Sequence, residues 1–114
     1  MLTIDSLKAY GADTQEGLGR CFGNAEFYLK LVASVPSEKN FGKLKDAMAA
    51  GDLGSAFEAA HALKGVLANL SLTSLAKTAG ELTELLRNRT QTDYQPLLDE
   101  LEKKRAGLEK LCSE

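Results

Sequence analysis

The sequence predicts an all-α protein, folded as an antiparallel four-helix bundle with short helices capping its N-terminal end. Apolar residues recur at spacings of three and four over several segments of two to four turns, which is the period of an amphipathic helix. No stretch of useful length alternates apolar and polar residues as a half-buried strand does. Short connections join the segments, as in antiparallel bundles.

The composition is that of one soluble domain, residues 1–114. Apolar residues make up 44% of the chain and charged residues 26%. A net charge of −2 without a basic block argues against a nucleic-acid partner. The N-terminus lacks the basic and apolar parts of a signal peptide, and no apolar run approaches the roughly 20 residues that cross a bilayer. We therefore expect a cytoplasmic protein with no membrane segment.

The two cysteines, Cys21 and Cys112, have no close-spaced partner. Free thiols are the interpretation that suits a cytoplasmic protein. A disulfide between the two remains an open alternative.

Two short helices are expected before the body of the bundle. The first covers residues 4–10 and ends at Gly11. The second begins with the capping-box spacing of residues 13–16 and extends to about Cys21. Both should lie as a lid on the bundle. The side chains expected to anchor this lid inward are Leu7, Leu18 and Phe22.

Four longer helices should form the body, over residues 25–50, 53–70, 73–89 and 94–112. Asn24 is a good N-cap for the first. Pro36 should end or kink that helix, and Ser37 can cap its continuation. Gly51 then ends it, and Asp52 caps the next helix.

The third and fourth body helices have similar signals. Ser71 or Thr73 starts the third, a polar loop covers residues 88–92, and Asp93 caps the fourth, with Pro96 in its first turn. The predicted core stripe of the third helix consists of Leu75, Ala79, Leu82 and Leu86.

The helix expected over residues 53–70 carries the chain's one histidine. At roughly 100° per residue, its leucines and core alanines cluster on one side, and His61 lies roughly 160° from the centre of that cluster. The imidazole should therefore face solvent. Lys64 follows on the same face, and Gly65 costs the helix about 1 kcal/mol relative to alanine. This group suits a phosphoryl anion carried by a bulky partner that comes close to the backbone.

Apolar residues near the histidine suggest a surface on which a partner docks. Phe57 and Leu72 lie roughly 40° and 20° from His61 around the helix, and Leu53 lies roughly 80° away. Ala68 adds a small side chain two turns on, over which a partner can settle. The alternative for Leu72 is that the helix ends first and Leu72 turns inward.

Residues 60–65, with the sequence AHALKG, resemble the His-x-Leu-Lys-Gly signature of histidine-containing phosphotransfer (HPt) domains. Residues 21–28 resemble the segment that opens the family's first long helix, and residues 49–52 resemble its turn before the histidine helix. There is one departure: a glycine that the family often has after the following Asn-Leu is Ser71 here.

The resemblance implies a phosphocarrier rather than an enzyme, relaying a phosphoryl group between aspartates of receiver domains. His61 would accept the group, Lys64 would stabilise its charge, and Gly65 would allow the partner's close approach. Some family members hold the histidine Nδ1–H with a Gln or Glu on the next helix, and Thr83 occupies the matching position. Mg²⁺ is expected only on the receiver. No Gly-rich phosphate loop indicates ATP binding, and one histidine argues against a metal site.

Two other functions fit the same residues less well. A helical adaptor could bind a receiver or kinase through the apolar patch without ever being phosphorylated, but it need not keep the histidine, lysine and glycine together. A phosphoacceptor module of a larger kinase is disfavoured because the chain begins with Met1 and ends just after its last expected helix. We expect the protein to be a monomer.

Overall fold

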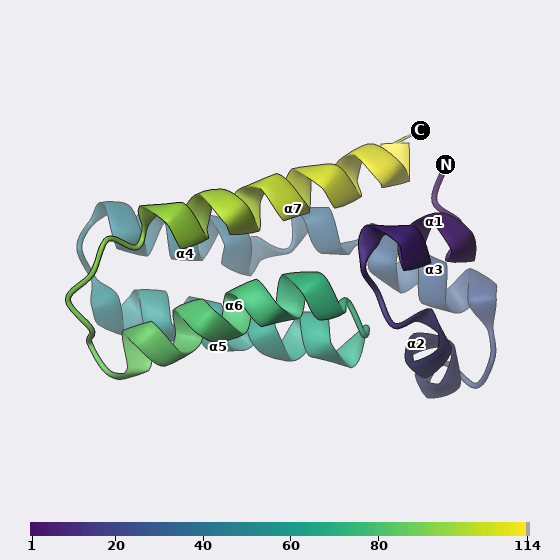
Figure 1. Ribbon diagram of the computed structural model, residues 1–114, viewed down its shortest axis with the longest axis horizontal. Helices are drawn as coiled ribbons and strands as arrows, with labels where there is room; N and C mark the ends of the chain where they lie inside the picture. Colours follow the sequence, from purple (N-terminus) through teal and green to yellow (C-terminus); the bar gives the residue numbers. More distant parts are fainter. Residues whose placement is uncertain (114) are drawn as a thin grey trace.

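The computed structural model describes residues 1–113, which form helices and connecting turns, as the sequence predicts. The longer helices run along the long axis, and the shorter N-terminal ones gather at one end, near the end of the last helix (Figure 1). Within the described residues no helix has the length and apolar character needed to span a membrane. The elements are α1 Ile4–Tyr10, α2 Thr14–Arg20, α3 Ala25–Ala33, the 3₁₀ helix η1 Val35–Ser37, α4 Lys39–Ala49, α5 Leu53–Asn69, α6 Thr73–Arg87 and α7 Gln95–Ser113.

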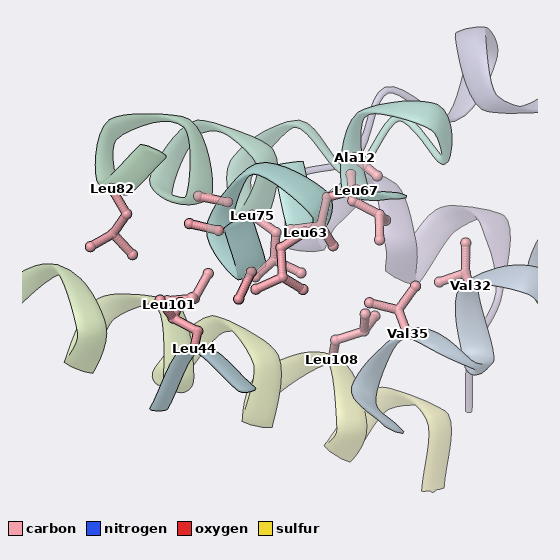
Figure 2. Packing of buried hydrophobic residues seen from close by; sticks show 14 of the residues in the cluster. Ala12, Val32, Val35, Leu44, Leu63, Leu67, Leu75, Leu82, Leu101 and Leu108 are labelled. Atoms are coloured by element: carbon pink, nitrogen blue, oxygen red, sulfur yellow. The ribbon is translucent and has the colours of Figure 1, made fainter. Parts of the chain in front are cut away.

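Helices α4 to α7 enclose the core. Helix α5 packs against both α4 and α6, and α6 packs in turn against α7. Buried leucines from all four helices point into the space between them, among them Leu44, Leu63, Leu75, Leu82 and Leu101 (Figure 2). Since the inner side of α5 is committed to this core, its opposite side is left for solvent.

The first body helix is shorter than predicted, so the prediction of one helix over residues 25–50 is wrong in extent. The chain does break at Pro36, as expected, because proline has no backbone N–H and disfavours helix before it. Ser37 does not cap the continuation. Glu38 does, and its carboxylate accepts the N–H of Asn40 at 2.7 Å. Helix α3 thus joins α1 and α2 at the end of the molecule (Figure 1).

The start of α5 is built as the sequence predicts. Gly51 has a φ of +71°, where the chain reverses after α4. Asp52 then caps α5: its carboxylate accepts the backbone N–H of Ser55 at 3.1 Å and the Ser55 hydroxyl at 2.7 Å. Both hydrogen bonds lower the pKa of the Asp52 carboxyl, and the bond from the backbone N–H has the larger effect. The buried face of α5 consists of Ala56, Ala59, Ala60, Leu63 and Leu67.

The N-terminal helices are fastened to the turn between α5 and α6 by paired backbone hydrogen bonds. The N–H of Asp13 donates to the carbonyl of Ser71 at 2.9 Å, and the N–H of Ser74 donates to the carbonyl of Gly11 at 3.1 Å. Gly11 also ends α1, with a φ of +121° that suits glycine. The predicted lid therefore closes the end of the bundle to which α5 runs.

Ser71 occupies the turn where the HPt family often has glycine. Its φ is +56°, in the left-handed region that non-glycine residues seldom adopt. The hydroxyl of Ser71 donates to the carboxylate of Glu16 at 2.8 Å. The left-handed turn is thus kept without glycine, and the serine hydroxyl adds a tie between the turn and α2.

One predicted anchor of the lid is wrong. Leu7 is buried and Leu18 is partly buried, as expected, but Phe22 is 99% exposed. Helix α2 ends before it, and Phe22 adopts a left-handed φ of +56° that carries its side chain outward. Cys21 and Tyr28 are the buried residues of this segment instead.

Gly17 makes room for the buried Tyr28, whose hydroxyl donates to the carbonyl of Leu70 at 2.7 Å. A Cβ at Gly17 would overlap the tyrosine ring and its oxygen. We expect Gly17→Ala to lower the free energy of unfolding by about 1–3 kcal/mol, because the ring must shift and its hydrogen bond must lengthen. Thermal unfolding followed by circular dichroism measures this.

The control is Gly19→Ala in the same helix, where a Cβ meets nothing within 4 Å. It should leave stability unchanged or raise it slightly, since alanine has the better helix propensity. Equal effects of the two substitutions would show that Gly17 has no special packing role.

Candidate functional site

His61 lies near the middle of α5, on the side that faces away from the core. Its side chain is exposed, as the helical wheel predicts, whereas Leu63 and Leu67 on the inner side are fully buried. Among residues 1–113, no protein group hydrogen-bonds to either ring nitrogen of His61. Neither ring nitrogen is therefore committed to a hydrogen bond with the described residues.

An aromatic ring one turn earlier in α5 supports the imidazole. The rings of Phe57 and His61 are stacked, with centroids 5.7 Å apart and planes 15° from parallel. The guanidinium carbon of Arg87, at the end of α6, lies 5.1 Å from the centroid of the Phe57 ring. Arg87 also pairs with Glu84 at 3.4 Å. The phenyl ring is half-buried and thus links α6 to the exposed histidine.

Lys64 lies over the neighbouring helix α6. A Cβ placed on Gly80 would stand 3.8 Å from both Cδ and Cε of Lys64, so the lysine stem crosses α6 where it has no side chain. Lys64 is half-buried, and its aliphatic stem lies against α6. No carboxylate of the described chain is within ion-pairing distance of this ammonium, so its charge is uncommitted.

The backbone next to the histidine is bare. Gly65 is exposed, and a Cβ built on it meets nothing within 4 Å. Ala68, one turn further on, is exposed as well. Packing inside the protein therefore does not require a glycine at residue 65, although this glycine weakens the helix.

Of the predicted docking residues, two stay near the surface and one does not. Leu53 and Phe57 are half-buried, but Leu72 is fully buried, so its assignment to the exposed patch is wrong. Helix α5 ends at Asn69, and the chain then turns at Ser71, which has a left-handed φ. The predicted offset of roughly 20° between Leu72 and His61 assumed that the helix continues to Leu72. The alternative in which Leu72 turns inward is the one observed.

The predicted role of Thr83 beside the histidine is also wrong. Thr83 is fully buried in α6, and its hydroxyl donates to the carbonyl of Ala79 at 2.7 Å. This bond to the residue four positions earlier is a common choice for a threonine inside a helix. The hydroxyl oxygen could still accept a hydrogen bond, but Thr83 is fully buried whereas His61 is exposed, and no hydrogen bond joins the two side chains.

Sequence reasoning missed three parts of the site. Phe57 was assigned to docking alone, although its spacing of four from His61 could have indicated a contact within the helix. The contact of Arg87 with Phe57 has no local sequence signal, because it depends on how α5 and α6 pack together. Gly80 was likewise not connected to Lys64.

Comparison with known proteins gives one match. The family model described as Hpt domain matches residues 36–112, which is more than half of the chain. The matched part begins at Pro36 and contains α4 to α6 and nearly all of α7, together with His61, Lys64 and Gly65. The lid helices α1 to α3 precede it. No curated protein and no solved structure matches the chain.

Proposed function

The chain belongs to the Hpt domain family, and on this premise we propose that it relays a phosphoryl group between aspartates of receiver domains through phospho-His61. The observation that carries the proposal is the exposed imidazole next to the bare backbone of Gly65 and the uncommitted ammonium of Lys64. A partner must bring its aspartate close to α5, and this face has the room for it.

The transfer uses the ring nitrogen as nucleophile. A neutral imidazole has one ring nitrogen with a free lone pair, and this nitrogen is the nucleophile. The lone pair attacks phosphorus on the receiver's aspartyl phosphate, a P–N bond forms, and the aspartate leaves with the electrons of the P–O bond. In the family, Nε2 is the nitrogen used. Such a transfer depends on alignment and on charge neutralisation more than on acid–base catalysis.

The chain needs no ATP site for this role, because the phosphoryl group arrives on the partner. It is a phosphocarrier in this proposal and not a kinase. Mg²⁺ belongs to the receiver, where it neutralises part of the phosphoryl charge. Location in the cytoplasm is part of the proposal, and it agrees with the free thiols of Cys21 and Cys112.

Lys64 should neutralise part of the phosphoryl charge during the transfer. We expect Lys64→Ala to slow transfer about three- to tenfold, because one charge-assisted contact to the moving oxygens is lost. Rapid-quench measurement of transfer from a phosphorylated receiver reports the rate. Lys43→Ala, an exposed lysine on α4, is the control and should transfer at the wild-type rate. If both variants behave alike, Lys64 has no part in the site.

The proposal is tested by incubating the protein with a receiver domain that carries labelled aspartyl phosphate, with Mg²⁺ present. We expect label to pass to this chain and to be lost in acid, as a phosphohistidine is. A panel of receivers from the source organism would identify the donor and the acceptor. A receiver that binds tightly without ever transferring label would instead support the adaptor function.

A further inference from the structure

The stacked rings of Phe57 and His61 suggest how an exposed imidazole keeps one orientation. A histidine on a helix surface can rotate about two side-chain bonds. Here no hydrogen bond from the described residues holds either ring nitrogen, and Thr83, the expected holder, is engaged with Ala79. The contact that remains is the parallel stack at 5.7 Å.

Fixing the plane of the imidazole fixes the direction of its nucleophile. The lone pair of a ring nitrogen lies in the plane of the ring and points outward from its edge. The phenyl ring of Phe57 lies beside the imidazole, 5.7 Å between centroids and 15° from parallel, so it restricts tilting of the imidazole plane and makes no hydrogen bond at the ring nitrogens. It therefore limits rotation out of the reactive direction without blocking the incoming phosphorus, which must approach roughly in line with the lone pair.

The phenyl ring is itself held. Its body packs against the core between α5 and α6. The guanidinium carbon of Arg87 also lies 5.1 Å from the centroid of the phenyl ring, a favourable distance for a cation–π contact. Arg87 is in turn paired with Glu84 one turn earlier in α6. The chain of contacts thus starts on α6 and ends at the imidazole.

We infer that Phe57, steadied by Arg87, is a positioning residue that sets the plane of the His61 imidazole for phosphoryl transfer. The inference rests on the proposed function of His61. It assigns to an aromatic face the task that a hydrogen bond to Nδ1 performs in some family members. A positioning role differs from a docking role in what a substitution changes. Replacing a docking residue raises the receiver concentration that gives half-maximal transfer, whereas replacing a positioning residue lowers the transfer rate once the receiver is bound.

The test compares Phe57→Leu, which keeps an apolar side chain but removes the ring, with Phe57→Tyr, which keeps the ring. We expect the leucine variant to transfer about three- to tenfold more slowly at saturating receiver, with the half-saturating concentration nearly unchanged. The tyrosine variant should transfer at close to the wild-type rate. Phe41→Leu, which alters another half-buried phenylalanine on α4, controls for general loosening and should also transfer normally.

A spectroscopic signature is independent of transfer. The carbon-bound ring protons of His61 should be displaced from their usual resonance positions in the free protein, because the phenyl ring of Phe57 is stacked beside the imidazole at a centroid distance of 5.7 Å. They should move to ordinary positions in Phe57→Leu and stay in place in Phe57→Tyr. Arg87→Gln should shift them partway, whereas Arg20→Gln, which removes an equal charge paired with Glu16 on α2, should not.

Three results would overturn the inference. The first is a leucine variant with an unchanged maximal rate, whether or not its half-saturating concentration rises. The second is a His61 spectrum that does not depend on the ring at residue 57. The third is wild-type protein that takes no label from any receiver while its ring protons still report the stack. This last result means that the proposed function has failed, and the stack then has no transfer to serve.

Discussion

Replacing His61 with Gln abolishes phosphoryl uptake from a receiver and leaves the helical circular dichroism unchanged: this is the largest effect that we expect from any single substitution. Glutamine is polar and of similar length, but its amide has no nucleophilic lone pair comparable to that of imidazole. Because the side chain is exposed and accepts no hydrogen bond from the described residues, its loss should change stability by less than about 0.5 kcal/mol.

The measurement is transfer of labelled phosphate from a receiver to this chain, followed by separation of the two proteins. Binding of the unphosphorylated receiver, measured separately, should survive in His61→Gln, so that loss of label reflects chemistry and not lost docking. Label that persists in the variant would place the phosphoryl group on another residue and refute the assignment.

Most of the fold is predictable from local signals, because those signals act within a few residues. Asn24 and Asp52 cap their helices through their own side chains, and Gly11 ends the first helix with a positive φ. The core stripe of α6 also follows from its period alone, since Leu75 and Leu82 are fully buried as predicted. Each of these features depends on sequence neighbours or on helical geometry.

The errors at Leu72 and Phe22 come from positions where the chain leaves regular helical geometry. Ser71 and Phe22 both adopt a left-handed φ of +56°. Because neither residue is glycine, its type does not predict a turn there. Each turn redirects the side chains that follow it. Leu72 is carried into the core, and Phe22 itself is carried out of it. Extrapolating a helical wheel past the end of its helix cannot anticipate either result.

In the candidate site, too, features of a single helix were predictable, whereas contacts between helices were not. The exposure of His61 and the bare surface at Gly65 depend on the period of one helix, and both follow from the sequence. The contacts with Arg87 and Gly80 depend on how α6 packs beside α5, and a single helical wheel does not contain that information. The exposed position of the histidine proposed to react was therefore predictable, but its contacts with neighbouring residues were not.

Gly65 allows function and stability to be changed in opposite directions. Since a Cβ at this position meets nothing in the free protein, Gly65→Ala should raise the free energy of unfolding by about 0.5–1 kcal/mol through better helix propensity. The same methyl group would stand where a receiver must approach the backbone. We expect transfer to slow in Gly65→Ala and to fall by about tenfold or more in Gly65→Leu, because a misplacement of about 1 Å disrupts alignment.

Gly42 provides the matched control for this prediction. It also lies at an exposed position inside a helix, α4, and a Cβ there likewise meets nothing within 4 Å. Gly42→Ala should therefore give the same gain in thermal stability and leave transfer untouched. A protein that is stabilised by both alanines but slowed by only one has a glycine at residue 65 for the sake of its partner. Unchanged transfer in Gly65→Leu would instead mean that the receiver does not approach this part of α5.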